Sequence, residues 1–130
     1  MRKLFLLALA VAPTAFSQKK AQQLKPPAIT VLERTAHRDQ DRLNIDGRLK
    51  NTGEKQATDL VIIVDILDSG KQLLTTQKGA SEPESIDPGQ EGEFHSQMPL
   101  PARAVFVRLS FEDGSTREIK ATNAGLFAID

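Results

Sequence analysis

The sequence predicts an all-β protein, a sandwich of two packed antiparallel sheets with about seven strands. Three observations lead to this fold class. Apolar residues recur at every second position in several short segments, which is the period of a half-buried strand. Turn-forming residues separate these segments at short intervals. No segment shows the 3.6-residue apolar period of an amphipathic helix. The predicted sandwich covers residues 29–121 of the 130-residue chain.

Three strands are expected in the first half of this domain. The first begins at Ile29 and ends near Arg34. The second alternates apolar and polar side chains from Leu43 to Lys50, which predicts one buried and one solvated face. The third, residues 60–67, is long and rich in β-branched side chains, so we expect it at the centre of a sheet.

Four more strands are expected in the second half. Asp87-Pro88-Gly89 predicts a turn, because proline presets φ and glycine accepts a positive φ. Asp113-Gly114 is typical of a hairpin. Between and around these turns, strands are expected over residues 71–77, 91–98, 105–111 and 116–121.

Residues 1–17 predict a cleaved signal peptide. Two basic residues precede an apolar run over residues 4–12, and the small side chains of Ala15 and Ser17 suit cleavage before Gln18. The apolar run is less than half of the about 20 residues that a membrane-spanning helix needs. We therefore expect an exported protein, periplasmic or secreted, with no membrane span in its mature form.

The remaining segments are expected to flank the sandwich. Residues 18–28 predict a flexible leader rich in lysine and proline, and residues 122–130 a C-terminal tail. The chain has no cysteine, which excludes disulfides, a cysteine nucleophile and thiolate metal sites. An apolar core must therefore stabilise the fold without covalent cross-links.

The charge balance excludes nucleic acid as a partner. The chain carries 17 basic residues, two of them in the predicted signal peptide, and 17 acidic residues, so the mature protein is slightly acidic. It has neither Trp nor Tyr, the side chains on which bases most often stack. We expect the partner to be a protein or an envelope component.

Several residues in the middle of the chain form a pattern typical of a known family. They are Gly47, Leu49, Asn51 and Gly53, then the stretch Val64-Asp65-Ile66-Leu67-Asp68 and Gly70, then Pro88-Gly89 ahead of Phe94. On these residues the chain resembles the FxLYD family of bacterial extracytoplasmic domains, although the five-residue stretch matches the family's naming motif at Asp68 alone. The resemblance covers residues 43–111 and implies an immunoglobulin-like sandwich that serves as an exported accessory or binding domain. It carries over no catalytic residue.

Candidate chemical sites are weak, so we predict no enzyme activity, no metal and no cofactor. His37, Asp39 and Asp41 alternate along the chain, but the calcium-loop pattern fails at the next positions and the other histidine, His95, is distant in sequence. No Gly-x-Ser-x-Gly elbow is present. Glu91 and the next acidic residue of that strand, which share a face, are expected to keep the strand soluble.

One apolar surface is the candidate interaction site. Val61 and Ile63 are expected on the outer face of their strand, beside an outward-facing Phe106. Two alternatives remain for this patch. The C-terminal tail covers it with Leu126 and Phe127, or a partner docks there.

The favoured function is therefore an exported, non-catalytic module that binds or scaffolds a protein or an envelope component. The second candidate is a structural subunit whose sheet edges pair with copies of itself. The third is a hydrolase whose catalytic residues meet only in the folded chain. The sequence leaves the partner and the oligomeric state open, because sandwiches serve unrelated functions.

Overall fold

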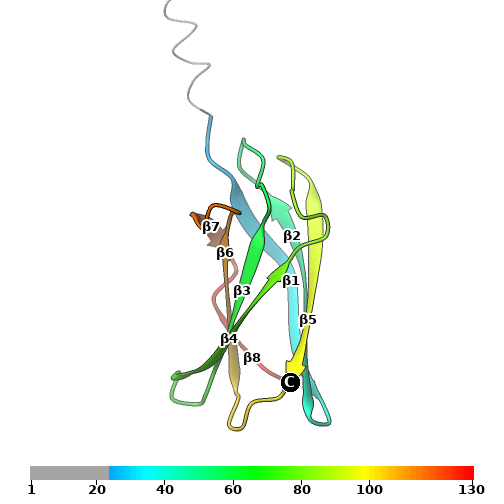
Figure 1. The fold of residues 1–130 in the computed structure, drawn as a ribbon, viewed down its shortest axis with the longest axis vertical. Helices are drawn as coiled ribbons and strands as arrows, with labels where there is room; N and C mark the ends of the chain where they lie inside the picture. Colours follow the sequence, from blue (N-terminus) through cyan, green and yellow to red (C-terminus); the bar gives the residue numbers. More distant parts are fainter. Residues whose placement is uncertain (1–23) are drawn as a thin grey trace, which may run out of the picture.

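The computed structural model describes residues 24–130, which form eight strands and no helix (Figure 1). The predicted signal peptide and the first part of the predicted leader lie outside these residues. Within them there is no helix that is long and apolar enough to cross a membrane. The strands are β1 (Ala28–Asp39), β2 (Arg42–Asn51), β3 (Val61–Leu67), β4 (Leu73–Ala80), β5 (Glu91–Pro99), β6 (Phe106–Glu112), β7 (Glu118–Thr122) and β8 (Leu126–Ala128).

The strands form two layers that face each other, so the predicted all-β, immunoglobulin-like sandwich is confirmed. In one layer β2 lies between β1 and β5, and in the other β3 lies between β4 and β6. The continuous order is β4-β3-β6-β7-β1-β2-β5, because β7 pairs with β6 and also, in parallel, with β1. The sandwich is thus closed on the β7 side and open between β4 and β5.

Aliphatic side chains fill the space between the layers. The alternation predicted for β2 and β3 is confirmed, because Leu43, Ile45, Ile62 and Val64 are buried and point at the opposite layer. Phe111 is the largest fully buried side chain. Burying one such residue stabilises a fold by about 1.5–3 kcal/mol, so this cluster supplies the stability that cysteines do not.

The first strand is longer than predicted. It runs on from Arg34 to Asp39, and its register against β2 shifts between Val31 and Glu33. The extra residue is Leu32, which forms a β-bulge and remains exposed. The bulge interrupts the alternation of apolar and polar residues, so the second half of the strand was not recognised from the sequence.

The C-terminal tail is part of the sandwich and does not lie over its outer face, which corrects the predicted domain boundary. Its strand β8 pairs antiparallel with the first half of β6, beyond the residues that pair with β7. The backbone N–H of Asp130 then donates to the carbonyl of Ala36 in β1, at 2.8 Å. The last residues therefore help to join the two layers.

Asn51, at the end of β2, is a fully buried polar residue that ties three segments together. Its side-chain amide donates to the carbonyls of Lys55 and Ile86, both at 2.9 Å. Its side-chain oxygen accepts from the backbone N–H of Gly53 at 3.0 Å and of Ala28 at 3.4 Å. The side chain thereby satisfies backbone groups of Ala28, Gly53 and Lys55, and it adds a second hydrogen bond to the Ile86 carbonyl, which also accepts from the N–H of Ala57.

Two glycines on either side of Asn51 allow close approaches. A Cβ on Gly47 would lie 2.2 Å from the ring of Phe94, so that ring occupies the place of a side chain. A Cβ on Gly53 would lie 2.1 Å from the carbonyl oxygen of Pro26, so the leader packs directly on this turn. Both glycines belong to the residues that carry the FxLYD resemblance, and both have a packing role here.

We predict that Asn51→Ala lowers the free energy of unfolding by about 3 kcal/mol or more, because each buried backbone group left without a partner costs about 1–3 kcal/mol. Denaturant unfolding measures the loss. The matched control is Asn44→Ala, which removes a single side-chain hydrogen bond to Gln97 and should cost about 1 kcal/mol. Equal losses in the two variants would show that Asn51 has no special role.

Candidate functional site

The predicted apolar patch lies on the outer face of the sheet that contains β3 and β6, but its members are not adjacent. β3 and β6 are antiparallel, with Val61 opposite Glu112 and Leu67 opposite Phe106. Phe106 is therefore six positions from the neighbour of Val61, about 20 Å at about 3.4 Å per residue. The expected contact between Phe106 and Val61 or Ile63 is wrong, because it ignored the antiparallel register.

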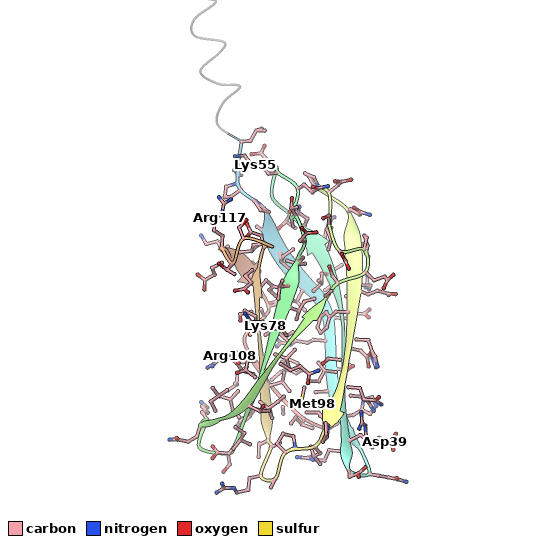
Figure 2. All side chains as sticks on the ribbon, viewed as in Figure 1. Asp39, Lys55, Lys78, Met98, Arg108 and Arg117 are labelled. Carbon is pink, nitrogen blue, oxygen red and sulfur yellow. The ribbon has the colours of Figure 1, made fainter. Side chains whose placement is uncertain are left out.

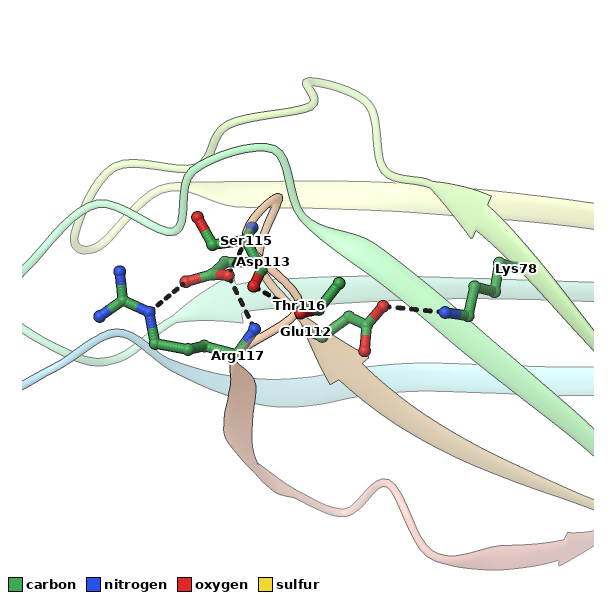
Figure 3. A network of polar contacts seen from close by, with 6 residues as sticks. All are labelled: Lys78, Glu112, Asp113, Ser115, Thr116 and Arg117. Atoms are coloured by element: carbon green, nitrogen blue, oxygen red, sulfur yellow. Dashed lines mark hydrogen bonds and ion pairs between the residues drawn. The ribbon is translucent and has the colours of Figure 1, made fainter.

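Charged side chains occupy the space between these apolar residues. Arg108 forms an ion pair with Asp65 at 2.9 Å, between Ile63 and Phe106 on the outer face. Lys78 of β4 reaches Glu112 of β6 at 3.0 Å (Figure 3). Because β3 lies between those two strands, this ion pair passes over the side of β3 that carries the two aliphatic residues.

The two tail residues of the predicted patch point in opposite directions. Leu126 pairs with Arg108 and shares its outer face, whereas Phe127 pairs with the buried Val107 and packs against the core. The guanidinium of Arg34 lies 4.8 Å from the centre of the Phe127 ring, a cation–π contact. The tail therefore does not cover the patch.

A smaller apolar contact does form at the far end of this face. Leu67 is 1% exposed although it alternates with the buried Ile66 and faces outward. Its register neighbours are Phe106 on one side and Leu73 on the other. Leu73 is 56% exposed. Because only these three apolar side chains meet here, they form a small cluster and not a broad docking surface.

The opposite sheet carries a different surface, made by the outward-facing side chains of β1, β2 and β5, which we call the polar face. Cross-strand partners lie in rows on it, with Asp46 between Thr35 and His95 in one row. In the next row Asn44 lies beside Gln97, whose side-chain N–H₂ donates to it at 2.9 Å. This surface is not evident from the sequence, because the pairing of three strands determines which residues meet.

Arg48 is the centre of the best-defined contact on the polar face. Its guanidinium lies 2.9 Å from a carboxylate oxygen of Glu33 in β1 and 2.6 Å from one of Glu91 in β5. The hydrogen bond from Arg48 lowers the pKa of Glu33, and the hydrogen bond to Glu33 in turn raises the pKa of Arg48. Glu91 thus pairs with an arginine on the solvent-exposed side of the sheet.

A depression of about 540 Å³ opens on the polar face. Asp46 at its rim contacts the ring Nδ1 of His95. The depression is wide open to solvent and is lined mostly by charged and polar side chains, unlike the enclosed apolar pockets that bind small ligands. Its lining residues are Glu33, Arg34, Thr35, Asp46, Gly47, Arg48, Ala80, Glu82, Glu93, Phe94 and His95.

The sequence pattern considered for metal binding lies at one tip of the molecule. His37 and Asp39 end β1 and Asp41 is in the following turn, and all three are exposed. Figure 2 shows Asp39 at the end of the sandwich opposite Lys55 and Arg117. Among residues 24–130, no three His, Cys, Asp or Glu side chains are placed to hold a metal ion together.

A second depression, of about 550 Å³, lies at the other end of the sandwich, and one of its two carboxylates, that of Asp113, is already hydrogen-bonded within a turn. The carboxylate of Asp113 accepts from the backbone N–H groups of Ser115 at 2.8 Å and of Arg117 at 3.0 Å (Figure 3). These bonds close the predicted hairpin between β6 and β7. The lining residues are Pro27, Lys55, Gln56, Thr58, Asp59, Asp113, Gly114, Ser115 and Arg117.

The Asp113 turn should make stability depend on pH. The hydrogen bond from the backbone N–H of Arg117 lowers the pKa of Asp113 from its ordinary 3.8. A lowered folded-state pKa stabilises the fold above the unfolded-state value, and this contribution is lost as the pH falls through the folded-state pKa. We expect the stability advantage of the wild type over Asp113→Asn to be larger at about pH 6 than at about pH 2.5. An advantage that grows on acidification would contradict this account.

No protein-family model matches the sequence, and no curated protein matches it. The FxLYD resemblance therefore stays a prediction.

Solved structures do show likenesses in shape. A Bordetella pertussis protein provisionally named ApaA is 18% identical with a TM-score of 0.49, and the match covers 83% of this chain and 93% of that one. The CARDB domain of PF1109 from Pyrococcus furiosus is 12% identical with a TM-score of 0.48, over 84% and 96%. β-Glucosidase 3B from Thermotoga neapolitana is 15% identical with a TM-score of 0.46, over 78% of this chain and 16% of that one. Likenesses this distant say nothing about activity.

Proposed function

We propose that the protein is an exported, non-catalytic module that binds a protein or another envelope component through the polar face. The observation that carries this proposal is the set of cross-strand side-chain pairs on β1, β2 and β5. Side chains that are already held in place lose less conformational entropy when a partner binds. They also lie on paired strands, which position them better than a loop would.

The charges of the polar face indicate what kind of partner surface would fit. Four carboxylates line the depression, those of Glu33, Asp46, Glu82 and Glu93, against the guanidinium groups of two arginines. A partner with basic side chains would complement this face. Because most of these groups are exposed, the attraction should weaken as the salt concentration rises.

The FxLYD resemblance supports the same class of function, since it implies an exported accessory or binding domain. Two features that carry the resemblance have structural roles, because the side chain of Asn51 satisfies backbone groups and Gly53 allows the leader to pack. With these residues used by the fold, binding is assigned to the surface, where side chains can vary without loss of the core.

The test is capture from an envelope fraction, with the purified protein immobilised and charge-reversed variants compared. Glu93→Lys places a positive charge on the polar face, and we expect at least about tenfold weaker binding of the captured component, or about 1.4 kcal/mol. The matched control is Glu118→Lys on β7, which should bind as the wild type does. The mature protein from the same cells should begin at Gln18 if it is exported.

A different result would move the binding site. Phe106→Ser changes a half-buried aromatic side chain on the other sheet and should leave binding unchanged. Loss of binding in Phe106→Ser with full binding in Glu93→Lys would contradict the proposal and favour the apolar cluster around Leu67.

A further inference from the structure

The two free edges of the sandwich differ in how they are protected. β5 pairs only with β2, but it carries two glutamates and ends at Pro99, which are features that discourage a further strand from adding. The chain that follows β4 also crosses to it. Glu82 and Glu93 exchange both backbone hydrogen bonds, at 2.8 Å and 3.1 Å. In the first half of β5, the charged side chains and the backbone hydrogen bonds to Glu82 therefore hinder pairing with a further strand.

The β4 edge has none of these features. It pairs only with β3, and seven of its eight residues are exposed, the exception being Leu74. It contains no proline, and its one charged residue, Lys78, is paired with Glu112 on the outer face. Such a strand presents unpaired backbone N–H and C=O groups to any extended chain.

β4 also extends beyond the opposite sheet. Its residues Thr75, Gln77 and Gly79 are register partners of buried β3 residues, so they face inward, yet all three are exposed. A Cβ placed on Gly79 would have no atom within 4 Å. Figure 1 shows β4 running diagonally, with its end near β5 and its start away from it. Another strand therefore has room beside the first part of β4.

Near the end of β4, the space between the layers is too small to take a strand. The cavity lined by Ile62, Val64 and Phe94 has a volume of about 10 Å³, which is about the space that one water molecule needs. An added strand must therefore extend the β4 sheet and cannot be inserted into the core.

We propose that the added strand is β4 of a second copy of this chain, paired antiparallel about a two-fold axis. This inference goes beyond partner binding by the polar face and does not depend on it. A two-fold arrangement centred on Thr75 pairs the first part of β4, residues 73–77, with the same residues of the copy. It opposes no two lysines, and each copy already neutralises its Lys78 with its own Glu112.

The size of the contact sets the strength of the association. β4 has eight residues, whereas a stable protein interface has about 20–30 residues on each side. The dimer should therefore be weak and should depend on concentration. It would matter most where many copies are held close together.

Sedimentation equilibrium of the purified protein at concentrations up to about 1 mM tests the proposal, with each dissociation constant Kd converted to a free energy. We expect a monomer–dimer equilibrium. Gln77→Lys adds a positive charge to the exposed inner side of β4 in each copy and should weaken the dimer at least about tenfold. Thr75→Lys makes the same change two residues away and should act alike. The matched control is Gln97→Lys on β5, which should associate as the wild type does.

Thermal unfolding of each variant shows whether it is folded, and Thr75→Lys replaces Gln77→Lys if the latter is not. A protein that stays monomeric at every concentration would overturn the proposal. Dimerisation that survives both lysine substitutions on β4 would do so as well, as would dimerisation lost only in Gln97→Lys. A monomer whose β4 amides become protected when an extended foreign peptide is added would replace the second copy with a peptide partner.

Discussion

The buried side chain of Asn51 is the contact on which the organisation of this sandwich most depends. It is the polar residue through which β2, the start of β1 and the turn before β5 are joined at one end of the molecule. Its backbone takes part too, since its N–H donates to the carbonyl of Gln90 and its carbonyl accepts from Gly89. In a chain without disulfides, this network does locally what a covalent cross-link does in many exported domains.

The contacts that close the sandwich leave parts of its surface exposed. One side of the sandwich is closed by β7, by β8 and by the backbone contact between Asp130 and Ala36. The other side is closed only near Glu82 and Glu93, just beyond the end of β4. Toward the start of β4, its edge is free. This edge and the polar face of the other sheet are two exposed features that the core does not use.

The sequence was informative where a property repeats along one strand. Alternation of apolar and polar residues located β2 and β3 and their buried faces. The residue types of Asp87-Pro88-Gly89 predicted a turn, and the positive φ of 82° at Gly89 confirms it. Prediction failed where an outcome depends on which strands meet. The position of Phe106 relative to Val61 follows from an antiparallel register, and the pairing of β8 follows from a contact distant in sequence. Single-strand patterns contain neither kind of information.

Hydrogen–deuterium exchange of the dilute protein tests most directly the claim that Asn51 closes one end of the sandwich while β4 remains its open edge. The account predicts that amides in residues 51–57 and 86–90, although they lie in connections, exchange as slowly as those of β2. It also predicts that the backbone amides of β4 exchange faster than those of any other strand whose whole length is paired. Fast exchange in both connections together with a strongly protected β4 would contradict it.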